Sequence, residues 1–227
     1  LNEDTLWTGG PYDPVNPAAR AALPEVRRLI FAGRYAEAQA LADAKLMATP
    51  LSQMSYQPFG DLLIDMPGIP DFWARDYRRT LDLDSAVATT VFTVGGATFQ
   101  RDVVACPVHQ VIAVRIGADQ PGRVTCGIAL RSPQPASLSI EEDMLVLDGV
   151  NAGEHGILGA LRLSGRVRVL HQGGILERRA GGIGVRAADT VTLLVAMATR
   201  TWSVMFAKFS VIITAIWSLC WILYSSR

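Results

Sequence analysis

The aspartate and glutamate side chains are the main candidates for catalysis in this chain, because two carboxyl groups on either side of a bond can act as an acid and a base. Spacing along the chain does not pair any two of them. Glu141, Glu142 and Asp143 lie beside a predicted turn, and Asp82 and Asp84 share the side of a strand that is most simply solvated. The other carboxylates considered are Asp61, Asp65 and Glu154. We predict no catalytic residue in this chain.

Histidines, serines and glycines offer no better site. His109, His155 and His171 are isolated, without a His-x-x-x-His pair or a cysteine at zinc spacing. No Gly-x-Ser-x-Gly motif for an acyl-transfer nucleophile is present. The glycine-rich stretch 181–184 precedes a strand pattern rather than a helix, so it predicts a hairpin turn and not a phosphate loop. We therefore expect no metal and no cofactor.

Composition narrows the class of protein. The 227 residues carry no net charge, with a pI near 7.0, so the basic surface of a nucleic-acid-binding protein is missing. Cys106, Cys126 and Cys220 are too few for a disulfide scaffold. Buried thiols are the favoured interpretation of the first two, and a single bridge between them is the alternative.

The elements that would position these residues begin with a pair of helices near residues 24–48. Pro24 suits the first turn of a helix, and Gly33 suits the position just after its end. A second helix is predicted from Tyr35 to Ala48, because good helix formers fill it and Thr49-Pro50 would end it. The two helices are expected to form a hairpin.

After residue 55 the apolar period changes to two, which is typical of strands. Gly95-Gly96 joins two such stretches with a loop suited to a tight hairpin. Many short strands without interleaved helices predict a mainly β fold, an antiparallel β-sandwich. The predicted strands are Tyr56–Ile64, Tyr77–Leu83, Val87–Val94, Ala97–Ala105, Gln110–Ile116, Arg123–Leu130, Met144–Leu147, Gly159–Leu170 and Val191–Ala198.

Several ordered blocks of the chain resemble a known family. The opening stretch Asn2–Pro11 reads NEDTLWTGGP, and Tyr56–Leu62 reads YQPFGDL. Further blocks are Leu23–Ile30, Gly33–Ala38, Tyr77–Asp84, Phe99–Val103, Gln110–Arg115 and Ala188–Leu194. Over residues 1–200, with a helical insert at 17–48, the chain is similar to the N-terminal domain of glycoside hydrolase family 95, the α-L-fucosidase-like enzymes.

The resemblance implies a large β-sandwich, called a supersandwich, in an inverting α-L-fucosidase. In that family a following (α/α)6 barrel holds the catalytic residues, and none of the barrel motifs occurs in this chain. The resemblance thus implies a non-catalytic N-terminal fragment, truncated before its barrel and inactive alone. The barrel and a fucosylated glycan are the expected partners, and the family is typically secreted or periplasmic.

Residues 203–227 differ from the rest of the chain. This tail lacks Gly, Pro, Asp and Glu, and Phe209–Tyr224 is an uncharged run of sixteen residues. A membrane-spanning helix needs about 20 apolar residues. A frameshift product is the favoured interpretation, a C-terminal apolar transmembrane helix is the second, and a buried soluble segment is the third.

A second hypothesis for the whole chain is a carbohydrate-binding or interaction module held at a membrane by that tail. Aromatic faces stack on sugar rings when they are exposed. The candidate aromatic residues are Trp7, Tyr12, Phe72, Trp73 and Tyr77.

Overall fold

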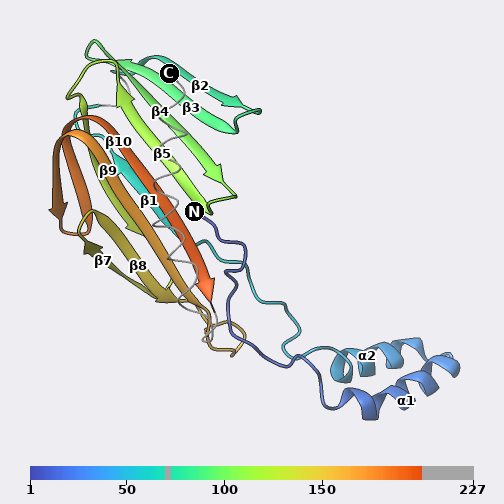
Figure 1. Ribbon diagram of the computed structural model, residues 1–227. Helices are drawn as coiled ribbons and strands as arrows, with labels where there is room; N and C mark the ends of the chain where they lie inside the picture. The colour runs from blue at the N-terminus through green and yellow to red at the C-terminus, as the bar shows by residue number, and fades with distance from the viewer. Residues whose placement is uncertain (70–72, 201–227) are drawn as a thin grey trace. The chain divides into compact units, whose positions relative to one another are not determined.

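The computed structural model describes residues 1–69 and 73–200, and this part of the chain is mainly β. It divides into two compact units. Among the described residues, the first unit comprises residues 1–6, 57–151 and 161–200 and contains the strands (Figure 1). The strands are β1 (Asp61–Asp65), β2 (Arg75–Asp82), β3 (Val87–Val94), β4 (Ala97–Cys106), β5 (Val111–Ala118), β6 (Val124–Arg131), β7 (Ala136–Glu141), β8 (Met144–Val150), β9 (Arg162–Arg179) and β10 (Gly182–Arg200).

The sheet is antiparallel at every pairing in the described strands, with the order β2-β3-β4-β5-β10-β9-β8-β7. The long strand β10 is its branch point. Residues 183–188 of β10 pair with β6, residues 190–195 pair with β5, and β9 runs along the other side of both parts. A β-bulge between these two parts lets the sheet divide into a β5–β2 branch and a β6–β1 branch.

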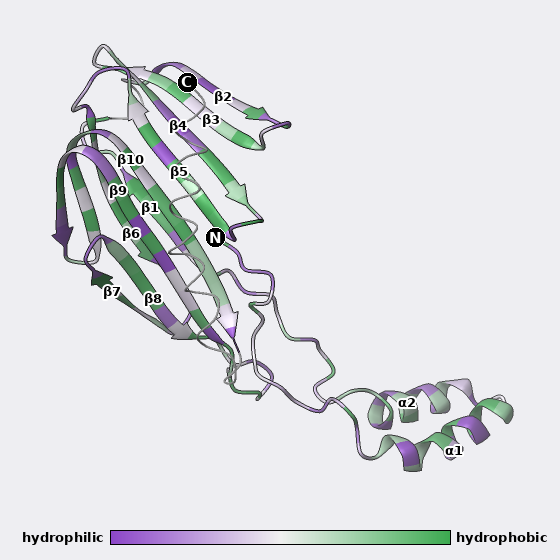
Figure 2. Cartoon of the chain, viewed as in Figure 1, coloured by the Kyte–Doolittle hydropathy of each residue, from purple (hydrophilic) through white to green (hydrophobic). Residues whose placement is uncertain are grey.

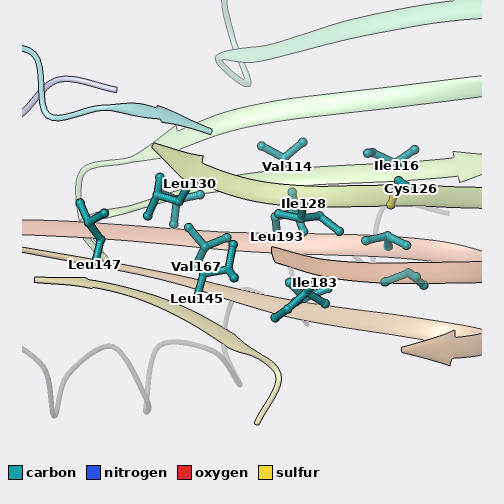
Figure 3. Close-up of a cluster of buried hydrophobic side chains, with 14 of the residues drawn as sticks. Val114, Ile116, Cys126, Ile128, Leu130, Leu145, Leu147, Val167, Ile183 and Leu193 are labelled. Carbon is teal, nitrogen blue, oxygen red and sulfur yellow. The ribbon is translucent and has the colours of Figure 1, made fainter. Parts of the chain in front are cut away.

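One apolar core joins the two branches. In β6 the alternate residues Val124, Cys126, Ile128 and Leu130 are buried, as expected for a strand with one face against a core. They lie in one cluster with side chains of β5, β8, β9 and β10, and Figure 3 shows Ile128 and Leu130 facing this cluster. The alternation of apolar and polar residues is visible along most strands in Figure 2. The structure therefore confirms the predicted fold class, a mainly β, antiparallel architecture with a shared apolar core.

Turn residues explain how neighbouring strands connect. Gly95 and Gly96 have φ of +58° and +76°, so both central residues of the β3–β4 hairpin occupy the left-handed region, as the tightest hairpin turns require. The predicted hairpin at 181–184 is also present, with its turn at Gly181 between β9 and β10.

The second unit comprises residues 7–56 and 152–160 and contains both helices. Helix α1 spans Ala19–Phe31 and α2 spans Tyr35–Lys45. Gly33 has φ of +73°, and Arg34 N donates to Leu29 O, which closes the end of α1 as predicted. Val26, Leu29 and Ala38 form a small apolar contact between the helices.

Several boundaries differ from the sequence predictions. Helix α1 begins at Ala19 rather than near Pro24, because Asn16 satisfies the first backbone donors: its side chain accepts from Ala18 N and its carbonyl from Ala19 N. Helix α2 ends at Lys45, three residues before Ala48. Strand β7 was not predicted, since its residues 136–141 mix serines with single apolar positions.

The predicted strand Tyr56–Ile64 is also shorter than expected. Only Asp61–Asp65 forms β1, paired with β6. The preceding Phe59 and Gly60 instead donate their N–H groups to Leu1 O. Gly60 lies so close to Arg131 O that a Cβ there would approach it to 2.1 Å. Two backbone segments therefore pass each other closely at this position, and only glycine leaves enough room.

The predicted C-terminal apolar helix at 203–227 lies outside the described residues. Within residues 1–69 and 73–200, neither helix is long and apolar enough to cross a membrane.

Candidate functional site

Glu154 is the centre of a hydrogen-bonded polar cluster in the second unit. Its Oε2 accepts from Thr8 Oγ1 and from Ser55 N at 2.8 Å, and its Oε1 accepts from Ser55 Oγ at 2.8 Å. Ser55 N also lies 3.0 Å from Thr8 Oγ1. One carboxylate thus ties together three segments that are far apart in the sequence. We call Thr8, Ser55 and Glu154 the carboxylate clip.

The clip holds Glu154 in its charged form. Hydrogen bonds from the Thr8 hydroxyl first, and then from the backbone and side chain of Ser55, lower the pKa of Glu154 from 4.5 to about 2. His155 Nε2 lies 3.9 Å from Glu154 Oε1, and this neighbour lowers the pKa further. A carboxylate held ionised at neutral pH cannot donate a proton, so Glu154 is unsuited to act as a general acid.

A short two-stranded ribbon carries the clip on one side and an aromatic pair on the other. Trp7 and Tyr56 form an isolated antiparallel bridge, and Thr8 N donates to Ser55 O at 2.9 Å. This pattern makes Trp7 and Tyr56 a non-hydrogen-bonded pair, the closer of the two kinds of facing residues. Their rings meet edge to face, with centroids 5.4 Å apart and planes inclined by 68°. Because neighbouring residues alternate sides, Thr8 and Ser55 point away from the rings.

Two of the other carboxylates that the sequence offered, Asp82 and Asp143, have structural partners of their own. Asp82 accepts from the backbone of Asp84 and Ser85, which lowers its pKa, and so it caps the β2–β3 turn. Asp143 pairs with Arg168, with 3.2 Å between Oδ2 and Nε. Glu141 and Glu142 lie at the β7–β8 turn as predicted, and Asp61 and Asp65 lie at the two ends of β1.

The three histidines belong to different elements of the chain. His109 is in the turn before β5, and His171 is on β9 with its Nδ1 2.7 Å from Gly173 O. His155 lies close to Glu154, a carboxylate that the sequence singled out. Across the described ranges, no group of three or more His, Cys, Asp or Glu side chains could hold a metal ion.

The candidate aromatic residues that the structure describes belong to different segments: Trp7 and Tyr12 to the second unit, Trp73 and Tyr77 to the first. Trp7 is 40% exposed and pairs with Tyr56, a residue that the sequence did not single out. Tyr77 lies on β2, with Arg79 over its ring, while Trp73 precedes that strand and is well exposed. Tyr12 is half-buried, and Phe72 lies outside the described residues.

The clip could not be found from the sequence. Thr8, Ser55 and Glu154 are separated by 47 and 99 positions, and no periodic pattern joins them. One weak signal for their proximity was present. The segments NEDTLWTGGP and YQPFGDL both match the family pattern, and the bridge between Trp7 and Tyr56 joins these two segments.

Comparison with known proteins shows which protein family and which curated proteins this chain resembles. A family model described as "Glycosyl hydrolase family 65, N-terminal domain" matches residues 1–202. The chain is 40% identical over 133 residues to "Alpha-L-fucosidase 2" of Arabidopsis thaliana, covering 58% of this chain and 15% of that protein. It is 33% identical over 145 residues to "Probable alpha-fucosidase A" of Aspergillus niger, covering 60% of this chain and 17% of that protein.

A solved structure named for a kojibiose phosphorylase from the human microbiome aligns with this chain with a TM-score of 0.44 and 8% identity. That match covers 72% of this chain and 26% of the other. The chain spans less than a fifth of the length of both curated relatives.

The predicted resemblance to the N-terminal domain of glycoside hydrolases with α-L-fucosidase relatives is therefore confirmed, although the matching family model carries the number 65. Over residues 1–202, this chain belongs to the glycosyl hydrolase family 65 N-terminal domain family.

Proposed function

We propose that this chain is the non-catalytic N-terminal domain of an α-L-fucosidase-like hydrolase of glycoside hydrolase family 95. Its β-sandwich is of the supersandwich type. Its role is to scaffold a separate (α/α)6 barrel that supplies the acid and base for an inverting reaction on a fucosylated glycan. Secretion or a periplasmic location belongs to the same proposal.

The observation that carries the proposal is the 40% identity to "Alpha-L-fucosidase 2" over 133 residues, within the region that the family model matches. The candidate carboxylates support the non-catalytic part of the proposal. Glu154, Asp82 and Asp143 are each occupied by hydrogen bonds or an ion pair that hold the local fold. An acid and base pair instead needs two carboxyl groups facing one bond.

A domain exchange tests the scaffolding role. The segment of the Arabidopsis relative that aligns with this chain is replaced by the aligned residues of this chain. We expect the chimera to be soluble and to hydrolyse an aryl α-L-fucoside, because the exchanged domain presents the same fold to the rest of that protein.

The control is the same relative with the aligned segment deleted, which we expect to be insoluble or inactive. A chimera that is soluble and cooperatively folded but inactive would contradict the proposal. Full activity of the deleted control would also contradict it, because no scaffold would then be needed.

A further inference from the structure

We propose that residues 209–224, the apolar segment near the C-terminus of this chain, pack against the outer face of its own sheet, over strands β5 and β10. The outer face is the side of these strands that points away from the main core. The proposal goes beyond the scaffolding role and does not depend on it, because it concerns a contact made within this chain.

Strands β5 and β10 are apolar on both faces where they pair. In β10, residues 193–196 are four consecutive apolar residues, and each is at most 6% exposed. In β5, residues 111–114 are also apolar, and all but Ile112 are at most 5% exposed. A strand with one solvated face alternates instead, and a near-continuous apolar run is typical of a strand that is covered on both faces.

The register of the sheet shows which of these residues point away from the main core. Leu193 pairs with Val114, and both belong to the main core cluster. Because side chains alternate along a strand, Leu194 and its partner Ala113 point to the opposite, outer face. The outer face carries four of these buried residues, which we call the outer patch: Val111, Ala113, Leu194 and Ala196.

The outer patch is covered, and its described apolar neighbours come from the same sheet. Its side chains are 2–6% exposed, although none of them belongs to the main core cluster. Within the described ranges, the cluster that Val111 and Ala196 form gains only Cys106, which pairs with Val111 from the neighbouring strand β4. A neighbour in the same sheet flanks the patch rather than lies over it. The segment that lies over the patch therefore belongs to a part of the chain outside these ranges.

The surroundings of the outer patch favour an uncharged, apolar occupant. On β9, Arg168 is the partner of Leu194 in the register, and it already forms an ion pair with Asp143. Residues 209–224 contain no charged residue, and thirteen of the sixteen are apolar. In water this run would expose a large apolar surface, whereas packing against the patch removes apolar surface from water on both sides.

The segment is tethered to the strand that carries half of the outer patch. Strand β10 ends at Arg200, four residues after Ala196, which is a distance of about 13 Å along the strand. Residues 201–208 separate this end from the segment, and eight residues reach up to about 26 Å when they are extended. The tether therefore lets the segment reach the patch. It also gives the segment an effective concentration on the order of millimolar, which favours it over a second copy of the chain.

Cys106 reports on whether the outer patch is covered, because it is half-buried and packs against Val111 and Ala196. The full chain is prepared with Cys220→Ser, so that the segment itself carries no thiol. The rate at which iodoacetamide labels Cys106 is then measured by mass spectrometry of the peptides. The parent rate is compared with the rates in two variants of the segment.

The disrupting variant combines Ile213→Asp with Trp217→Asp. We expect it to speed the labelling of Cys106 about tenfold, because carboxylates within the run oppose its burial and leave the patch open. The matched control combines Ser225→Asp with Ser226→Asp, which adds the same charge beyond the run and should leave the rate unchanged. Cys126, which is buried in the main core, should stay unlabelled throughout and so shows that the sheet is folded.

Labelling of Cys106 at one rate in the parent and in both variants would overturn the proposal. Labelling of the parent that slows as the protein concentration rises would also overturn it, because a second copy would then supply the cover. Co-sedimentation of the parent with phosphatidylcholine vesicles, without any change in the labelling of Cys106, would be a third contradiction. In that case lipid would hold the segment while the patch stayed covered.

Discussion

At Glu154, hydrogen-bond donors rather than burial set the chemistry of the carboxylate. Three donor groups from Thr8 and Ser55 converge on it, and its pKa falls to about 2. At Cys126 the opposite applies: burial in the core raises the pKa of the thiol to about 11. Both groups therefore keep one protonation state near neutral pH: Glu154 is an anion and Cys126 is a neutral thiol.

The clip predicts a specific acid sensitivity. Because the folded pKa of Glu154 lies below its ordinary value of 4.5, its contribution to stability is fully present above pH 4.5 and is lost as the pH falls toward 2. In Glu154→Gln this pH-dependent contribution is absent. The free energy of unfolding, measured by urea titration at several pH values, should fall less steeply between pH 4.5 and 2 in the variant. Parallel curves for the two proteins would refute the role of the clip.

The two described cysteines should react differently with thiol reagents. Cys126 is 1% exposed, whereas Cys106 is half-buried, and both are free thiols. In a Cys220→Ser background at pH 8, one equivalent of thiol should react in the native protein and a second only after unfolding. Mass spectrometry of the labelled peptides identifies each site. Rapid native labelling of Cys126 is the result that would contradict the described core.

At the scale of elements, the bend in the β9–β10 hairpin determines where β5 and β6 can pair. Gly174 lies on this bend, with φ of +67°, and a Cβ there would meet Arg186 O at 2.3 Å and Ala188 N at 2.6 Å. Gly181, in the turn of the same hairpin, has φ of +75° but open space around it. The two glycines therefore separate the cost of backbone conformation from the cost of a steric clash.

We expect Gly181→Ala to cost about 1 kcal/mol, since only the left-handed conformation is penalised. Gly174→Ala should cost more, about 3 kcal/mol, because the methyl group also displaces the facing strand. Urea-induced unfolding of both variants measures the difference. Equal costs would show that the bend is not closely packed at Gly174.

Local patterns predicted the elements better than their connections. The period of two located most strands, and Gly33 and Gly95-Gly96 marked a helix end and a hairpin turn correctly. The start of α1 was missed because it depends on hydrogen bonds from Asn16 rather than on Pro24. The full length of β9 and β10 was missed because glycines 173 and 174, which normally interrupt strands, lie inside this bent hairpin.

At the scale of the whole molecule, the fold class could be predicted from the sequence but the branching of the sheet at β10 could not. Pairing of β10 with both β5 and β6 joins positions more than fifty residues apart, and apolar alternation says only that a strand has a buried face. The carboxylate clip could not be predicted for the same reason, because its residues are 47 and 99 positions apart and share no sequence pattern. The family resemblance could be recognised because it rests on ordered blocks along the chain, which the match over residues 1–202 confirms.

The fold is that of a glycoside hydrolase N-terminal domain, and the central proposal is that this domain is non-catalytic. The most direct test is hydrolysis of 4-nitrophenyl α-L-fucopyranoside by the purified full chain, followed by release of 4-nitrophenol. We predict a rate equal to that of buffer, from pH 4 to 8. Release of 4-nitrophenol that scales with protein concentration and disappears in a carboxylate variant such as Glu154→Gln or Asp143→Asn would contradict the claim.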